Sequence, residues 1–219
     1  MKKIIILSII AIGLSHSEIV QGQGTLYLSN LGQPPTSSLA IGNNSWQAVG
    51  FFTGNNPNGY LLDSVQLAML DATGNPTNFA VMIYAQSGNL SGPSPGSSNL
   101  GTLDGSLNPS TTGIYTYTPD SILTLSASSF YYIVVTSGAA VADNAYEWSR
   151  AGTYSYDSSE NWGAGTVWNS TDGSHWSGNI FLNPQFAISA TPIPEPGVLS
   201  LLGLGGAALL WRRQAKTAR

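Results

Sequence analysis

The feature that most constrains the fold of this chain is a recurrence of short strand-like segments between clusters of turn-forming residues. Residues 130–136 are β-branched and aromatic throughout, a composition that suits a pleated sheet. Residues 60–70 alternate in polarity, with Val65, Leu67 and Met69 on one face, which is the period of a strand with one buried side. The body shows no convincing amphipathic helix, so the pattern predicts an all-β domain.

About eight to ten such segments predict an antiparallel β-sandwich of the jelly-roll type. In that architecture the apolar faces of two sheets pack inward, about 10 Å apart. Residues 29–44 and 86–108 are expected to be polar loops, and residues 151–177 show no clear period. The last strand, residues 180–189, is expected to bend or to lie at an edge at Pro184, because proline has no N–H to donate.

Apolar segments flank this body on both sides. Residues 1–22 are predicted to be a signal peptide, with Lys2 and Lys3 before an apolar run of 11 residues, too short for a stable membrane span. Residues 197–211 are 15 uncharged residues, which as a helix measure about 22 Å against a bilayer core of about 30 Å. We therefore expect a signal helix, a domain over residues 23–190 and a C-terminal transmembrane helix that holds the membrane only temporarily.

A Pro-Glu-Pro sequence precedes the C-terminal apolar run, and a basic cluster follows it. The residues of this layout are Pro194, Glu195 and Pro196, then Trp211, Arg212 and Arg213. The tryptophan is expected at the membrane interface and the arginines on the cytoplasmic side. We assign residues 191–219 to a sorting signal, with the motif at 194–196, the apolar helix at 197–211 and the basic tail at 212–219.

This layout resembles the PEP-CTERM sorting domain over residues 192–219. The resemblance implies recognition by a dedicated membrane enzyme, an exosortase, which cleaves near the motif and releases the protein or transfers it to the cell surface. An ordinary tail anchor is the alternative, and the short apolar run disfavours it.

The body resembles the choice-of-anchor R domain. Strand patterns carry the resemblance, among them residues 59–67, 81–84 and 131–135 and a late section that ends at Trp176. Such domains are joined to one of several alternative surface-anchoring tails, and the family has no assigned catalytic residues to transfer. One departure is Tyr132, where the family pattern has a Trp.

Charge and cysteine content exclude several classes of function. The body carries one base, Arg150, against nine acids, a formal charge of −8. Nucleic-acid binding needs clustered Lys and Arg, so we expect none. The chain has no cysteine, which excludes disulfides, thiol catalysis and cysteine-ligated metals.

Three patterns suggest catalysis, and each has a simpler explanation. Residues 92–96 match Gly-x-Ser-x-Gly around Ser94, but two prolines flank the serine and no helix is expected after it. His175 is the only histidine of the body, and one histidine does not make a zinc site. Glu147 and Glu160 are the only glutamates of the body. As a pair of carboxylates they suggest a glycoside hydrolase as an alternative, and the simpler explanation is that both are solvated acids in loops. We expect no enzyme.

Oxygen ligands for calcium could come from residues 143–144 and 157–161. Neither segment matches the Asp-x-Asp-x-Asp-Gly loop, so no metal or other cofactor is expected, and calcium remains the alternative.

Aromatic residues gather late in the body. Such side chains stack on sugar rings in carbohydrate-binding proteins, and the alternative is that they cover one end of the core. The candidates for glycan stacking are Trp148, Trp162, Trp168 and Trp176.

These observations predict an exported structural or adhesive protein of the bacterial cell envelope or extracellular matrix. Its expected partners are the Sec translocon, signal peptidase, an exosortase and, transiently, the membrane. The precursor is expected to be anchored in the inner membrane before it reaches the cell surface or matrix. A carbohydrate-binding module for exopolysaccharide and a glycoside hydrolase are the two alternatives.

Overall fold

The computed structural model describes residues 24–87, 93–142, 144–179 and 182–195. These residues form strands, turns and irregular segments, without a helix. Within this part of the chain, no helical segment meets the length and apolarity that a membrane crossing requires. The predicted signal helix at 1–22 and C-terminal helix at 197–211 lie outside the described residues.

The described residues contain 14 strands in one sheet, and every strand pair is antiparallel. The strand order is β11-β1-β14-β4-β7-β6-β5-β9-β3-β12-β13, with β8 and β10 also on β4, and β2 on β10. The strands are β1 (Thr25–Ser29), β2 (Pro35–Ile41), β3 (Trp46–Phe52), β4 (Tyr60–Thr73), β5 (Ala80–Ser87), β6 (Ser94–Asp104), β7 (Gly113–Pro119), β8 (Thr124–Leu125), β9 (Phe130–Thr136), β10 (Ala145–Ala151), β11 (Asp157–Ser158), β12 (Gly163–Ser170), β13 (Ser177–Asn179) and β14 (Phe186–Pro192).

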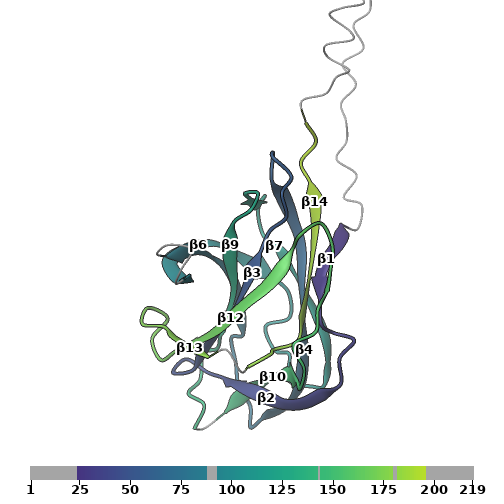
Figure 1. Ribbon diagram of the computed structural model, residues 1–219. Coiled ribbons are helices and arrows are strands. Elements are labelled where there is room, and N and C mark those ends of the chain that lie inside the picture. Colours follow the sequence, from purple (N-terminus) through teal and green to yellow (C-terminus); the bar gives the residue numbers. More distant parts are fainter. Residues whose placement is uncertain (1–23, 88–92, 143, 180–181, 196–219) are drawn as a thin grey trace, which may run out of the picture.

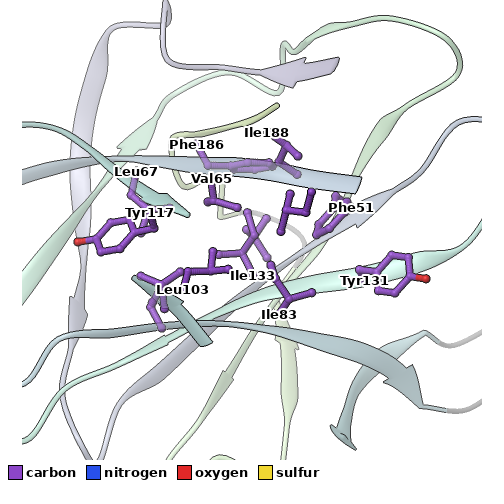
Figure 2. Packing of buried hydrophobic residues seen from close by; sticks show 14 of the residues in the cluster. Phe51, Val65, Leu67, Ile83, Leu103, Tyr117, Tyr131, Ile133, Phe186 and Ile188 are labelled. Carbon is purple, nitrogen blue, oxygen red and sulfur yellow. The ribbon is translucent and has the colours of Figure 1, made fainter. Parts of the chain in front are cut away.

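The sheet curls into two arms that share one core (Figure 1). Strands β6 and β7 pair only through Leu103 with Pro119 and Asp104 with Thr118, and this corner separates the arms. The first arm contains β11, β1, β14, β4 and β7 with β2, β8 and β10, and the second contains β6, β5, β9, β3, β12 and β13. Figure 2 shows side chains of the two arms, such as Val65 and Ile133, meeting between them.

Alternation along the strands builds this inner core. In β4, Val65, Leu67 and Met69 are all buried, which confirms the face predicted for that strand. In β9, Ile133 belongs to the inner core and its neighbour Val134 to a second cluster, because successive side chains point to opposite faces. The prediction of an antiparallel all-β domain is confirmed.

Two segments that were predicted to be loops are strands. Strand β2 lies within residues 29–44 and pairs with β10. Its Leu39 and Ile41 are buried, whereas Ser37 is exposed and Ser38 is half-buried. Strand β6 lies within residues 86–108 and pairs with β5. Its Pro95 is tolerated because the other edge of β6 is paired only at the corner.

The last strand also differs from its prediction. Strand β14 begins at Phe186, after Pro184, and lies between β1 and β4 instead of at an edge. Pro184 itself forms an isolated bridge with Arg150. The strand runs to Pro192, two residues beyond the expected end of the body at residue 190.

Candidate functional site

The sorting motif begins where the last strand ends. Pro192 closes β14 opposite Tyr60, the first residue of β4. The Ile193 N–H then donates to the Gly59 carbonyl at 3.0 Å, and Asn56 Nδ2 donates to the Ile193 carbonyl at 3.4 Å. These two bonds, which we call the Ile193 clamp, hold the backbone against the turn at residues 54–59.

The first two residues of the motif follow the clamp directly. Pro194 and Glu195 are exposed, and one extended residue spans at most about 3.6 Å. The motif therefore starts within a few ångströms of the folded body, without a linker. The other predicted sorting residues lie outside the described part of the chain, namely Pro196, Trp211, Arg212 and Arg213.

The clamp contributes little to the stability of the whole fold. A hydrogen bond contributes about 1 kcal/mol net to a folded state, so its two bonds together contribute roughly 2 kcal/mol at most. The turn that holds them is rigid, because Gly59 has φ +78° and a Cβ there would lie 2.3 Å from the Leu125 carbonyl oxygen. Only glycine fits that position.

Both junctions of the body lie at one end of the sheet (Figure 1). Thr25, the first residue of β1, is paired with Ala190 near the end of β14. Because the two strands are antiparallel, the chain enters the body and leaves it on the same side. The expected signal-peptide junction and the sorting motif therefore share that end.

Two of the four tryptophans predicted to stack on glycans are interior. Trp148 is 0% exposed and donates its indole N–H to the Gln185 carbonyl at 2.9 Å. Trp162 is 3% exposed, and its ring stacks on Tyr27 at a centroid distance of 4.9 Å. Neither offers a face to a sugar ring, and core packing, the alternative prediction, describes both.

The other two tryptophans belong to a second cluster on the face of the second arm that points away from the core. Trp168 and Trp176 are half-buried there, and Trp46 joins them. This outer cluster comprises Trp46, Trp168 and Trp176 packed on Ala48, Met82, Tyr84, Tyr132 and Val134. Burial raises the pKa of Tyr132, which lies beneath them.

Sequence analysis missed Trp46, although strand alternation could have found it. Trp46 and Ala48 share one face of β3, while Val49 and Phe51 of the opposite face enter the inner core. The pairing of β3 with β12 places Trp168 beside Ala48. The cluster thus depends on strand register rather than on closeness in sequence.

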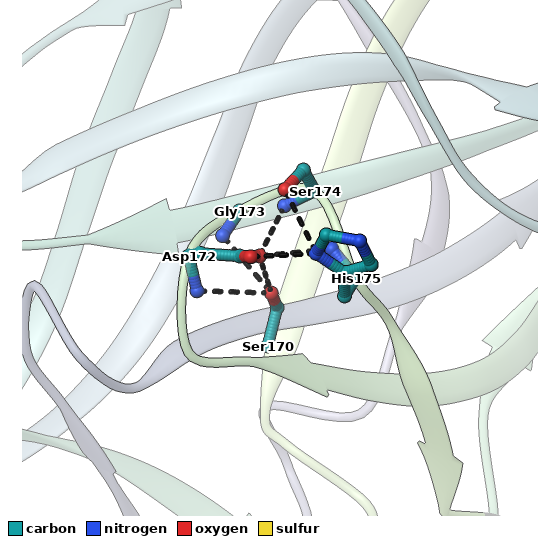
Figure 3. A network of polar contacts seen from close by, with 5 residues as sticks. All are labelled: Ser170, Asp172, Gly173, Ser174 and His175. Carbon is teal, nitrogen blue, oxygen red and sulfur yellow. Dashed lines mark hydrogen bonds and ion pairs between the residues drawn. The ribbon is translucent and has the colours of Figure 1, made fainter.

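A polar turn lies between β12 and β13 (Figure 3) and contacts the outer cluster through Gly173. Asp172 Oδ1 accepts the backbone N–H groups of Ser174 at 2.8 Å and His175 at 2.9 Å, and its Oδ2 lies 2.6 Å from His175 Nδ1. The His175 N–H, the His175 ring and the Ser174 N–H hold the pKa of Asp172 well below its usual range. Gly173 has φ +74°, and a Cβ there would lie 3.0 Å from the Trp46 ring.

The Ser, His and Asp side chains of this turn are not arranged as a catalytic triad. Ser174 Oγ lies 3.3 Å from His175 Nδ1, the same nitrogen that contacts Asp172. A triad needs the serine at Nε2 and the aspartate at Nδ1. The contacts therefore order the turn, and His175 is the turn histidine that the sequence suggested.

The two glutamates of the hydrolase alternative lie at opposite ends of β4. Glu147 is paired with Leu70 and accepts the Ser38 hydroxyl at 2.6 Å. The Glu160 backbone carbonyl lies near Tyr60, at the other end of β4. A Cβ on Gly54 would lie 2.4 Å from the Glu160 carbonyl oxygen and 2.5 Å from the Tyr60 hydroxyl. Residues 60 and 70 are separated by roughly 30 Å of strand, whereas glycosidase carboxyls are about 5–10 Å apart.

The remaining catalytic and metal patterns do not assemble into sites among the described residues. Ser94 begins β6, with its Oγ 2.9 Å from Ser87 Oγ, and a strand instead of a helix follows it. In the described ranges, no group of three or more His, Cys, Asp or Glu side chains could hold a metal. Asp143 lies outside them, and Asn144 Oδ1 accepts the Asn75 N–H.

Comparison with known proteins identifies the C-terminal segment. A family model described as the PEP-CTERM protein-sorting motif matches residues 192–214. No curated protein and no solved structure matches the chain. The match begins at Pro192, the residue that ends β14. The chain thus carries a PEP-CTERM sorting motif, which indicates an exported precursor that passes the membrane, is processed by an exosortase and is sorted to the cell surface.

Proposed function

We propose that the sorted body is a structural or adhesive component of the bacterial cell envelope or extracellular polymeric matrix, and not an enzyme. The observation that carries the proposal is the continuity of β14 with the sorting motif through the Ile193 clamp. Because no linker intervenes, the folded body is delivered as one rigid unit. Its formal charge of −8 keeps it away from anionic lipid, which suits release from the membrane.

We also propose that the body is a choice-of-anchor R type domain with a jelly-roll-like sandwich. The two arms that face each other across the inner core support this proposal. An experimental structure of a choice-of-anchor R domain tests it, and a strand order different from that found here would contradict it.

Intact mass of the protein recovered from the cell surface tests the sorting function. We expect the wild-type mass to lack Trp211 and the arginines that follow it. The variant Pro194→Ala/Glu195→Ala/Pro196→Ala is expected to remain membrane-bound at full C-terminal length. A surface form of the wild type that retains the basic tail would contradict the proposal.

A carbohydrate-binding module is the second candidate, with exopolysaccharide as the ligand. Three half-buried indoles gathered on one face of the second arm support it. Gly173 and Gly178 hold two of these rings, since a Cβ at each would lie 3.0 Å from Trp46 and 3.2 Å from Trp168. Aromatic faces held rigidly in this way are the surfaces on which sugars stack.

A glycan array probed with the processed protein tests this candidate. Binding should fall about five- to tenfold in Trp168→Ala and Trp176→Ala, since each lost stacking contact removes about 1–1.5 kcal/mol. Tyr154→Ala is the matched control, because Tyr154 is an exposed aromatic side chain outside the cluster. Absence of any bound glycan, or equal binding by all variants, would remove the candidate.

A further inference from the structure

Three turns meet at the end of the body from which the sorting motif leaves. The Ser128 N–H donates to the Gly54 carbonyl at 2.8 Å, and a Cβ on Gly54 would lie 2.4 Å from the Glu160 carbonyl oxygen. Asn56 of the first turn holds Ile193. We call this surface the end face; its turns are residues 54–59, 126–129 and 159–161.

The backbone of the end face is rigid and concentrates left-handed residues. Seven of the described residues have positive φ, and four of these seven lie in the three turns. They are Gly59 (+78°), Ser128 (+49°), Glu160 (+50°) and Asn161 (+63°). Such conformations persist only where the surroundings hold them, and they concentrate at functional sites.

The end face is polar and carries little charge. Its three turns contain asparagine, serine and glycine, no Lys or Arg, and one acid, Glu160. They therefore offer amide and hydroxyl groups for hydrogen bonds to a protein surface, without the clustered bases that anionic lipid attracts. Polar groups of this kind suit the rim of a protein–protein interface.

The clamp places the sorting motif beside the end face. While Ile193 is held by Gly59 and Asn56, Pro194 begins within about 3.8 Å of the body. An enzyme that binds Pro194 and Glu195 must therefore contact the end face or break the two hydrogen bonds of the clamp. We propose that it touches the end face, which is a docking surface for the exosortase, and that the clamp fixes the motif in register with the enzyme's active site. This proposal rests on the sorting function proposed above.

A spacer between the clamp and the motif tests the proposal. The full-length chain is expressed with an exosortase in a bacterial host, and the rate of precursor conversion is followed by intact mass. Inserting Gly-Ser-Gly-Ser between Ile193 and Pro194 should slow conversion at least about tenfold, because the motif loses its fixed position. Unchanged or faster conversion would overturn the proposal.

Two matched pairs of substitutions separate the clamp from the docking surface. Asn56→Ala should slow conversion several-fold, whereas Asn43→Ala should not, although Asn43 Nδ2 makes a similar bond to the Gly138 carbonyl at 3.3 Å, away from the end face. Ser128→Arg places a bulky charge on the end face and should slow conversion. Asn78→Arg places the same charge on another exposed turn at a similar backbone conformation, φ +55° against +49°, and should not. Equal rates within both pairs would overturn the proposal.

The same assay separates this inference from the sorting function itself. If the Pro194→Ala/Glu195→Ala/Pro196→Ala variant is processed like the wild type, the sorting function fails. If that variant is blocked while the spacer and end-face variants convert at the wild-type rate, only the docking surface fails. Urea unfolding of each purified variant confirms that the body is folded, so that a slower rate reports on docking.

Discussion

The inner core and the outer cluster use the same residue type in different ways. The inner core gathers 28 buried residues from both arms, including Trp148 and Trp162. The outer cluster has five buried residues, and its tryptophans remain half-exposed over them. The difference follows from which side of its strand each side chain occupies, and it indicates that the inner core contributes most of the stability of the fold.

The largest expected effect is on the inner core. Trp148→Ala removes a fully buried indole and its bond to the Gln185 carbonyl, so the free energy of unfolding should fall by about 3–5 kcal/mol. Urea unfolding of the processed protein measures it. Trp148→Phe, which keeps much of the ring volume, should lose less. A loss below about 1 kcal/mol for the alanine variant would contradict the assignment of Trp148 to the core.

Trp168→Ala should have a smaller effect on the same measurement. Its side chain is half-buried on one arm only, so less apolar area returns to water and the expected loss is about 1–2 kcal/mol. A loss as large as that of Trp148→Ala would mean that the outer cluster supports the whole fold, and the contrast between the two regions would not hold.

Gly173→Ala tests the contact between the turn and the outer cluster. Alanine is strained at φ +74°, and its Cβ would lie 3.0 Å from the Trp46 ring, so we expect a loss of about 1 kcal/mol or slightly more. Gly163→Ala is the control at the other end of β12, because nothing lies within 4 Å of its Cβ position. The control should change the free energy of unfolding by less than about 0.5 kcal/mol.

The smallest effect expected is a pH dependence from Asp172. The folded-state pKa of Asp172 is lowered by bonds from His175 and Ser174, so its stabilising contribution is present above the unfolded pKa of about 3.9. That contribution is lost as the pH falls from there toward the lower folded pKa. Asp172→Asn should therefore destabilise the protein at pH 7 and show less acid dependence below pH 4 in urea unfolding. Parallel pH profiles for the two proteins would contradict this.

Strand alternation made much of the inner core predictable. The face of β4 and the apolar strand β9 could be assigned from local pattern alone, because a period of two needs no knowledge of partners. Strands β2 and β6 were not predicted because their serine-rich sequences lack that pattern. Their pairing with β10 and β5 makes them strands.

The sites depended on contacts that local patterns do not contain. Trp148 and Trp168 are 20 residues apart in one aromatic stretch, and only strand register sends one inward and the other outward. The Ile193 clamp joins residues 137 positions apart. The Pro-Glu-Pro motif itself was predictable because its order of motif, apolar run and basic cluster is local to the C-terminal segment.

The position of β14 between β1 and β4 sets the order in which this protein can fold during export. The ribosome makes β1 first and β14 last. Until residue 192 has crossed the membrane, β1 has only β11 beside it, and the early part of β4 has only β7 and β8. The sheet therefore closes only after nearly the whole chain has crossed. Because the sorting motif follows this closing strand directly, a molecule that fails to fold also fails to hold its motif in place.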